Sequence, residues 1–570
     1  MCRKKGQLMS RLGLFHHFTK GGQLALHQYR MVSQVVRMTC TLSFFVGICG
    51  FFYLFWRETT PSDRYLFQQY LHAEFKTAIS FKDVANVTQT FGGKDGKVYT
   101  VYAIDILQNP IIQETAERIF ALLRVLLLKA LYISLFTSVV FVLFFCVRGH
   151  IKSRNVFQRG NRLMKSKQLT RLIRKKRKDS DLNLDGLPLI RHKETSHILI
   201  TGTTGAGKSN CLHTLLPQIR KRQDRALIVD LNGEFQRRYF SAGDIILNPL
   251  DERSAKWLPW ADCTEDAHFD QIACTLVPPG GNHDVFWENA GKVLLATALR
   301  QTKEEQNIKA LYDLLVTEDL VTFSQFFRQT EAAAYTHLEG EKMTLSIRAT
   351  LANQLQSFKR LKNTKNPFSI RKWVQNTEDK NWVFLSARPD QRDTLRPLMS
   401  AWVDIATNAL MGKEALNIRE ERQRLWIVVD ELPALQKVPS LMVGLAELRK
   451  YGGCILAGVQ SIPQISTIYG ITAASAILDL FNTKIFFRNT DPSTNAWIAK
   501  VLGEIEVTEK AESVSYGANT IRDGVSLTPH TKTKPLVLPS EISQLQDLEA
   551  LIKLPGNFPL CKINMTWKNV

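Results

Sequence analysis

Residues 197–212 read HILITGTTGAGKSNCL, and this stretch decides the fold expected for the chain. Its first five residues form a short apolar run typical of a β-strand, and the SNCLHTLLPQIRKR that starts at Ser209 has the periodicity of a helix. Between them, Gly202, Gly207, Lys208 and Ser209 satisfy the pattern G-x-x-x-x-G-K-[ST]. In a strand–loop–helix context this pattern predicts a phosphate-binding loop rather than a glycine-rich turn with an exposed lysine.

The loop carries the groups that a nucleoside triphosphate needs. Its glycines let backbone N–H groups turn toward the β-phosphate, and the helix N-terminus adds partial positive charge. Lys208 is expected to neutralise the β- and γ-phosphates, and Ser209 is expected to hold Mg²⁺. The sequence therefore predicts ATP and Mg²⁺ as cofactors. The nucleotide-binding residues are expected to be Gly202, Thr203, Thr204, Gly205, Ala206, Gly207, Lys208 and Ser209.

A loop of this kind needs a second strand that ends in carboxylates, and RLWIVVDELPAL supplies one. Its apolar residues 425–429 are followed by Asp430 and Glu431. Asp430 is expected to bind Mg²⁺ through water, and Glu431 to orient or deprotonate the attacking water. The alternative is an ordinary solvated strand end, which the neighbouring phosphate-binding loop disfavours.

Further apolar runs predict an α/β fold with a parallel central sheet. They are ALIVD (226–230), WVFLS (382–386), CILAGVQ (454–460) and KIFFR (484–488). Near-continuous apolar strands that alternate with helical stretches indicate a parallel sheet buried on both faces, with ligands at its carboxyl edge. Gln460 then ends a strand where it is able to sense the γ-phosphate, or is a plain polar strand end. Arg449, in LAELRKYGG, is either an arginine finger for a neighbouring subunit or a solvated arginine.

The net charge of +21 lies mostly in two short segments. Residues 1–37 hold seven Lys or Arg and residues 148–178 hold thirteen, and neither segment contains an acid. The rest of the chain is close to neutral. Such an excess predicts an acidic partner. For residues 148–178 two partners stay open: anionic membrane lipids, or the phosphates of DNA.

Each basic segment borders an apolar run long enough to cross a membrane. Residues 38–56 carry no charge and span roughly 28 Å as a helix, and residues 130–147 are similar. A buried core helix or a cleaved signal peptide is disfavoured, because both runs are uncharged and no A-x-A-like site follows the first. The positive-inside rule then places both termini in the cytoplasm and residues 57–129 outside. The nine cysteines lie outside 57–129 and form no CxxC pair, so neither a disulfide framework nor a zinc site is predicted.

Over almost its whole length the sequence resembles the TraD-type coupling proteins, which are membrane-anchored ATPases of type IV secretion and conjugation. The stretch GGQLALHQYRMVSQ, ahead of the first apolar run, is similar to the F-type branch. The other motifs that carry the resemblance are KDSDLNLDGLPLIR, GTTGAGKS, NGEF, ILNPLD, VFW, SIRA, DELPAL, ELRKYGGC, AGVQS, FFRN and SYGANTIRDGVS.

The resemblance implies a RecA-like motor of the FtsK and HerA type that assembles as a homo-hexamer around a channel. Single-stranded DNA, bound to the relaxase of a relaxosome, would pass to the components of a type IV secretion channel. By position, Lys208 matches the family's loop lysine, and Asp430 and Glu431 match its acidic pair. Arg449 matches the arginine finger, and Gln460 matches the glutamine sensor. F-type members continue past the motor into a tail that recognises an accessory protein. This sequence stops at Val570, so two alternatives stay open: recognition is placed elsewhere in the chain, or the partner differs.

The resulting expectation is an inner-membrane, multi-pass ATPase with an all-α insertion in its motor domain. Two rivals stay open: an ATPase that exports protein effectors only, and a nucleotide-regulated receptor or scaffold. The presence of Glu431 argues against the second rival. The expected segments are a basic tail (1–37), transmembrane helices (38–56 and 130–147) around a periplasmic segment (57–129), a basic juxtamembrane linker (148–187), the motor (188–260 and 375–560) and the inserted domain (261–374).

Overall fold

The computed structural model describes residues 23–80, 86–93, 96–153, 156–278, 285–412, 424–515 and 524–568. The chain divides into two compact units, which are treated separately below. Unit 1 consists of residues 1–155 and 510–528, and unit 2 consists of residues 156–509 and 529–570.

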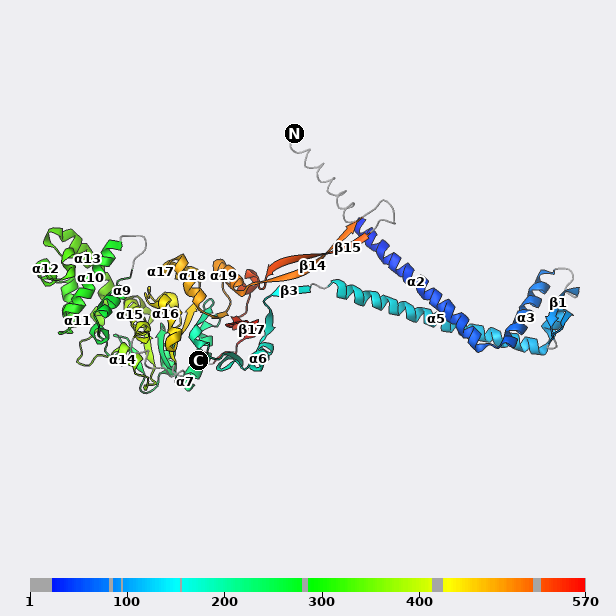
Figure 1. The fold of residues 1–570 in the computed structure, drawn as a ribbon, viewed down its shortest axis with the longest axis horizontal. Helices are drawn as coiled ribbons and strands as arrows, with labels where there is room; N and C mark the ends of the chain where they lie inside the picture. The colour runs from blue at the N-terminus through cyan, green and yellow to red at the C-terminus, as the bar shows by residue number, and fades with distance from the viewer. Residues whose placement is uncertain are drawn as a thin grey trace, which may run out of the picture. The chain divides into compact units, whose positions relative to one another are not determined.

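Unit 1 is dominated by two long helices, α2 (Gln23–Glu58) and α5 (Pro110–Ser153), which pack against each other (Figure 1). Within them, Val32–Glu58 and Pro110–Ile151 are long and apolar enough to cross a membrane. Both helices therefore continue well beyond the apolar runs seen in the sequence. Large side chains such as Phe45 and Phe136 are exposed on these helices, as expected of surfaces that lipid covers.

The segment between the two long helices forms a small folded group. It contains α3 (Pro61–Ile79), the antiparallel strands β1 (Thr88–Gly92) and β2 (Val98–Tyr102), and α4 (Ala103–Gln108). Ala73, Ala103, Ile106 and Ile112 form its buried core. The capping box of Thr60 and Asp63 sets the start of α3, where Thr60 Oγ1 accepts from the Asp63 N–H at 3.2 Å.

Unit 2 is built on one ten-stranded sheet in the order β4-β17-β16-β13-β7-β12-β11-β8-β10-β9. The seven strands from β13 to β9 are all parallel, which confirms the fold class predicted from the apolar runs. The other end of the sheet is mixed: β16 and β17 form an antiparallel pair beside β13, and β17 pairs parallel with β4. The strands are β4 (Leu163–Lys165), β7 (Ile198–Thr201), β8 (Arg225–Asp230), β9 (Ile245–Leu247), β10 (Val383–Ser386), β11 (Leu425–Val429), β12 (Gly453–Val459), β13 (Thr483–Phe486), β16 (Glu549–Lys553) and β17 (Leu560–Asn564).

Both faces of this sheet are buried, which explains why its strands are continuously apolar rather than alternating. Leu227 and Val229 of β8 point into one core, where α15 (Arg392–Leu410) packs. Ala226 and Ile228 point into the other, where α7 (Lys208–Lys221) packs. Outside the helical insertion described next, the other helices in the described part of this unit are α6 (Ser166–Lys175), α8 (Glu234–Tyr239), α16 (Leu441–Glu447), α17 (Ile462–Tyr469), α18 (Ile471–Leu480), α19 (Pro492–Leu502) and α20 (Pro539–Ser543).

A helical region is inserted between β9 and β10, and Figure 1 shows it as the green group of helices. The described residues of this region form no strand of their own. Its two ends meet where the Phe368 N–H donates to Lys256 O at 2.8 Å. Buried Arg225 of β8 closes the region, donating to Trp373 O at 2.7 Å and to Val374 O at 3.0 Å. The helices are α9 (Ala267–Leu276), α10 (Val285–Gln301), α11 (Ile308–Val316), α12 (Leu320–Phe327), α13 (Glu341–Gln354) and α14 (Ile370–Gln375).

Two smaller sheets lie outside the pattern predicted from the sequence. The long strands β14 (Glu504–Ser515) and β15 (Gly524–Pro535) form a three-stranded sheet with β3 (Val156–Gly160). A bidentate ion pair supports it, because Arg159 Nε and Nη2 each lie 2.7 Å from a Glu506 carboxylate oxygen. The strands β5 (Asp179–Leu184) and β6 (Leu187–Ile190) form a second hairpin. The stretch 148–187, expected as a linker, thus holds β3, β4, α6 and β5.

Candidate functional site

The phosphate-binding loop joins β7 to α7 at the carboxyl edge of the parallel sheet. Strand β7 ends at Thr201 and α7 begins at Lys208. The loop requires glycine at position 207, where φ is +124° and a Cβ would lie 2.9 Å from Phe487 Cε1. An L side chain would be strained there by the backbone and would collide with its neighbour as well. Gly205 also has a positive φ, +78°.

The side chain of Lys208 lies in the loop rather than in solvent. Its Nζ donates to Gly202 O at 2.7 Å and to Thr203 O at 3.2 Å, and the residue is only 8% exposed. Burial lowers the pKa of Lys208, and the negative charges of Glu431 and Asp430 oppose that shift. The loop thus holds a buried cation beside two carboxylates.

Asp430 and Glu431 follow β11 directly, beside Lys208. Burial raises the pKa of Asp430 to about 6, partly offset by Lys208. Burial also raises the pKa of Glu431, and a hydrogen bond from Gln460 opposes the shift. Asp430 Oδ1 and Glu431 Oε1 are buried without a hydrogen-bond partner among the residues the structure describes. Unpartnered buried carboxylate oxygens are rare, and hard oxygen ligands are what a hydrated Mg²⁺ takes, so the acidic pair fits the metal.

These residues line one pocket of about 380 Å³, which is large enough for a nucleotide. Of the predicted nucleotide-binding residues, Gly202, Thr203 and Ala206 do not line it. The carbonyls of Gly202 and Thr203 instead accept from Lys208, and Ala206 O accepts from the Leu548 N–H at 3.0 Å. The lining residues are Thr204, Gly205, Gly207, Lys208, Ser209, Asn210, Leu231, Asn232, Glu234, Arg392, Asp430, Glu431, Ala434, Gln460 and Trp567.

Gln460 lies in this pocket, one residue after the end of β12. Thr204 Oγ1 donates to Gln460 Oε1 at 3.5 Å, and the amide also bonds Glu431. Asn489 Nδ2 donates to Gln460 O at 2.5 Å and fixes the backbone at that point. The glutamine therefore bridges the phosphate-binding loop and the acidic pair.

Four further polar residues line the pocket although the sequence analysis gave them no role: Asn210, Asn232, Glu234 and Arg392. Arg392, the first residue of α15, donates from Nε to Leu231 O at 2.9 Å and from Nη2 to Asn232 Oδ1. Its positive charge also acts on Asp430. Asn232 stands in the NGEF motif, which carries the resemblance but predicts no role for it. Arg392 belongs to no motif, and only the approach of α15 to the end of β8 brings it to the site.

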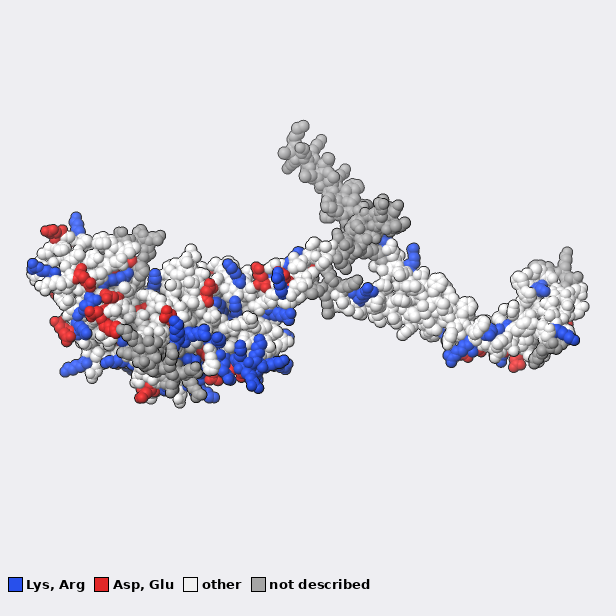
Figure 2. Space-filling view, viewed as in Figure 1, with Lys and Arg blue, Asp and Glu red and all other residues white. Residues whose placement is uncertain are grey.

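Arg449 lies away from this pocket, in a short 3-10 helix (Leu448–Tyr451) that precedes β12. It faces a second pocket, of about 700 Å³, at the amino edge of the parallel strands, where Ser196 precedes β7 and Asn482 precedes β13. No Asp or Glu is found among the described residues that line it. Figure 2 shows Lys and Arg gathered over α6, which leads into this region. The basic residues of the pocket are Lys176, Arg177, Lys178, Arg191, His192, Lys193 and Arg449.

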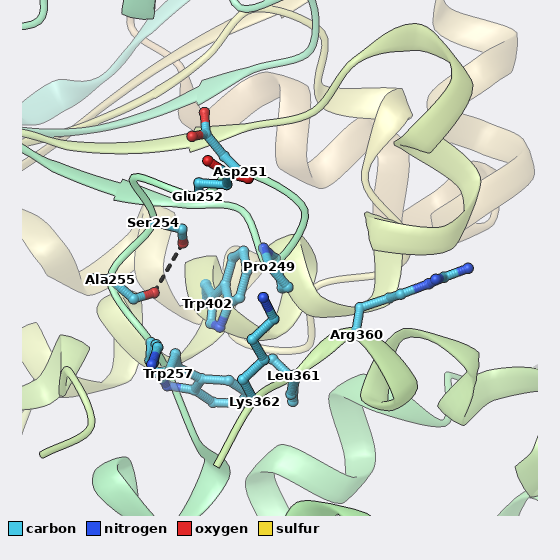
Figure 3. A pocket seen from close by; sticks show the side chains of 11 residues that line it. Pro249, Asp251, Glu252, Ser254, Ala255, Trp257, Arg360, Leu361, Lys362 and Trp402 are labelled. Carbon is cyan, nitrogen blue, oxygen red and sulfur yellow. Dashed lines mark hydrogen bonds between the residues drawn. The ribbon is translucent and has the colours of Figure 1, made fainter. Parts of the chain in front are cut away.

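A third pocket lies where the helical insertion leaves the sheet (Figure 3). Trp257 and Trp402 meet there edge to face, with ring centroids 5.7 Å apart, and Ser254 Oγ donates to Ala255 O at 2.9 Å. Its volume is only about 50 Å³, room for a few waters and not for a nucleotide. This pocket is a packing feature of the junction.

Comparison with known proteins gives concordant matches. The family profile described as "Type IV secretion-system coupling protein DNA-binding domain" matches residues 181–566. The chain is 32% identical over 565 residues to coupling protein TraD of Escherichia coli (strain K12), covering 96% of this chain and 77% of TraD. It is 22% identical over 400 residues to the Escherichia coli conjugal transfer protein TraG, covering 62% of each chain.

Solved structures of one plasmid coupling protein, TrwB, resemble this chain. The structure of TrwB in complex with ADP and Mg²⁺ is 29% identical, with a TM-score of 0.65. It covers 73% of this chain and 95% of TrwB. The structure of TrwB with the non-hydrolysable ATP analogue ADPNP gives the same identity and coverage, with a TM-score of 0.64.

Proposed function

Because the chain belongs to the type IV secretion-system coupling proteins, we propose that it is an inner-membrane ATPase that drives DNA through a secretion channel during conjugation. The observation that carries the enzymatic part is the acidic pair. Asp430 and Glu431 each keep one buried oxygen without a partner, beside the buried ammonium of Lys208. The TrwB complexes with ADP and Mg²⁺ support the same ligands for this chain.

The site residues predicted from the sequence then have separate tasks in hydrolysis. Lys208 neutralises the β- and γ-phosphates, and the loop N–H groups of residues 203–208 bind the β-phosphate. Ser209 and Asp430 hold Mg²⁺, which supplies positive charge against the phosphates. Glu431 takes a proton from the attacking water, and its raised pKa makes it a stronger base than an exposed carboxylate. Gln460, bonded to Glu431, reports the presence of the γ-phosphate.

Arg449 acts on the nucleotide of a neighbouring subunit in this proposal. Its position at the amino edge of the sheet, away from its own nucleotide pocket, supports a role in trans and therefore a homo-hexamer. The five other Lys and Arg residues of that pocket add positive potential that favours the approach of a polyphosphate.

DNA is proposed to reach the motor as a single strand led by a relaxase. The family description supports DNA as the partner, because it names a DNA-binding domain over residues 181–566. The helices α2 and α5 are proposed to anchor the chain as a multi-pass protein with both termini in the cytoplasm. The basic segment 148–178 is proposed to contact anionic lipid headgroups.

The test is ATP hydrolysis by the full-length protein in lipid nanodiscs, with and without single-stranded DNA and over a range of salt. The full chain is needed because β3, β4 and α6, which precede Asp179, belong to unit 2. Hydrolysis that DNA stimulates, and that Lys208→Ala abolishes, is the expected result. Stimulation should weaken as salt rises, because phosphate contacts release counterions.

Two other results would favour the rival functions. Hydrolysis that does not respond to DNA even at low salt would point to the export of proteins alone. Nucleotide binding without hydrolysis would point to a receptor or scaffold whose nucleotide regulates assembly.

A further inference from the structure

Trp567 is an outlier among the tryptophans of unit 2. Four of them, Trp257, Trp382, Trp402 and Trp426, are among the largest fully buried side chains of the protein. Trp567 is 64% exposed, yet it lines the nucleotide pocket, where it is the one aromatic residue among the described lining. An aromatic face at the mouth of a nucleotide pocket is free to stack on the base of a nucleotide held there.

The backbone on both sides of Trp567 is held firmly. Asn210 Nδ2 donates to Thr566 O at 3.0 Å, and the Lys568 N–H donates to Asn210 Oδ1 at 2.8 Å. The Asp185 carboxylate accepts from the Thr566 hydroxyl at 3.0 Å and from Lys568 Nζ at 2.8 Å. The exposed indole thus projects from a fixed strap (residues 565–568) rather than from a loose end.

The strap is tied to the phosphate-binding loop as well. The Met565 N–H donates to Leu548 O at 2.8 Å, and the Leu548 N–H donates to Ala206 O at 3.0 Å. The anchor residue Asn210 comes directly after Ser209, in the first turn of α7. The position of the indole is therefore set by the same elements that position the phosphates.

The direction in which a triphosphate must lie in the pocket places its nucleoside near Trp567. The γ-phosphate belongs where Lys208, Glu431 and Gln460 gather, and Thr204 contacts Gln460 at the start of the loop. The nucleoside is attached at the opposite end of the triphosphate chain. It must therefore leave the loop on the side of the first turn of α7, where Asn210 and Trp567 lie.

We propose that Trp567 is a base-binding residue, and that the nucleobase of the bound nucleotide stacks on its indole. This inference rests on the proposed function, since it needs a nucleotide in the pocket. A π-face contact discriminates poorly between bases, because every base has a π-face. Trp567 thus supplies affinity for a nucleoside rather than a preference for adenine over guanine.

The test compares ADP with pyrophosphate, which lacks the nucleoside, by calorimetric titration of the full-length protein in nanodiscs. Trp567→Ala is expected to weaken ADP binding roughly 5- to 150-fold, the range for loss of one base–aromatic stack. Pyrophosphate should bind the variant as it binds the wild type. Trp567→Phe keeps an aromatic face and should recover most of the ADP affinity. Because the side chain is exposed, the thermal stability of Trp567→Ala without nucleotide should match that of the wild type.

Two results would overturn the proposal. ADP affinity unchanged in Trp567→Ala would show that the indole does not contact the base. An equal loss for ADP and pyrophosphate would show that the strap supports the loop and not the nucleoside. A wild type that binds neither ligand would instead contradict the proposed function. Ile471→Ala, 82% exposed and outside the pocket, serves as the control for the loss of a large exposed side chain.

Discussion

Gly458 of β12 faces the main chain of Asp430 so closely that no side chain fits between them. A Cβ at position 458 would lie 1.9 Å from Asp430 O. The carboxyl end of β11, where Asp430 lies, therefore packs against a position of β12 that only glycine fits. Gly458→Ala should force the two strands apart, costing about 3 kcal/mol of unfolding free energy or more, and should reduce ATP hydrolysis sharply. Steady-state hydrolysis and chemical denaturation measure the two effects. Gly340→Ala is the matched control, because its nearest atom, Met343 Cε, is 3.5 Å from the new Cβ; equal behaviour of the two variants would contradict the argument.

Glu431→Gln should separate nucleotide binding from hydrolysis. The amide keeps the size and hydrogen-bonding capacity of the carboxylate but cannot accept the proton of water at neutral pH. ATP hydrolysis should fall by about 10²-fold or more, while ADP affinity stays within a few-fold. Equilibrium binding and single-turnover hydrolysis give the two numbers. Substantial hydrolysis by the variant would mean that another group accepts the proton.

Arg449→Ala should retain nucleotide binding, because the residue lies outside its own chain's nucleotide pocket. It should lose hydrolysis, because the proposed role of Arg449 is to act on the nucleotide of a neighbouring subunit. The decisive measurement mixes this variant with Lys208→Ala. A mixed ring contains some interfaces with an intact loop on one subunit and an intact arginine on the next, so activity should reappear on mixing. Lys450→Ala, an exposed neighbour, is the matched control. If mixing restores nothing although mixed oligomers form, Arg449 does not act in trans.

His197 should make unit 2 less stable in mild acid. The ring is buried, Nδ1 accepts from the Ile455 N–H at 3.0 Å, and Nε2 lies 3.0 Å from Leu445 O, so it is neutral. Burial lowers the pKa of His197 from 6.5 to about 4, so the unfolded chain binds a proton that the folded chain does not. The free energy of unfolding is therefore unaffected by this proton above pH 6.5. It falls as the pH drops from 6.5 toward 4, by roughly 3 kcal/mol in total.

The measurement is urea unfolding at several pH values, followed by tryptophan fluorescence. That signal reports unit 2, which holds every tryptophan except Trp56. His197→Gln cannot become charged, so its unfolding free energy should change less between pH 4 and pH 6.5 than that of the wild type. Parallel pH profiles for the two proteins would show that His197 is not the group responsible.

The parallel half of the sheet was predictable because burial on both faces leaves a continuous apolar signal. The runs at 226–230, 382–386 and 484–488 correspond to β8, β10 and β13 within two residues. The hairpin of β14 and β15 carries no such signal. Its strands, such as EIEVTEKAESVS, are polar and rich in charge, and their pairing depends on partners such as β3 that lie about 350 residues away in the sequence.

The site divides in the same way. Lys208, Asp430 and Glu431 stand in local motifs, so the sequence reveals them, although their roles remain predictions. Arg392 and Trp567 enter the pocket only after distant segments meet. A lone arginine or tryptophan in a sequence does not indicate which surface it will face.

The pairing of β17 with β4 also governs when the enzyme becomes complete. Leu560 lies opposite Leu163, so about 400 residues must be synthesised between the two partners. At ordinary translation rates this takes roughly 20–80 s. During that time the loop lacks the Leu548 bond to Ala206, and the pocket lacks its strap. The apolar helices α2 and α5 are synthesised before any of these contacts can form. A nascent chain is therefore expected to insert them into the bilayer before its nucleotide pocket is complete, so that membrane insertion precedes ATP hydrolysis.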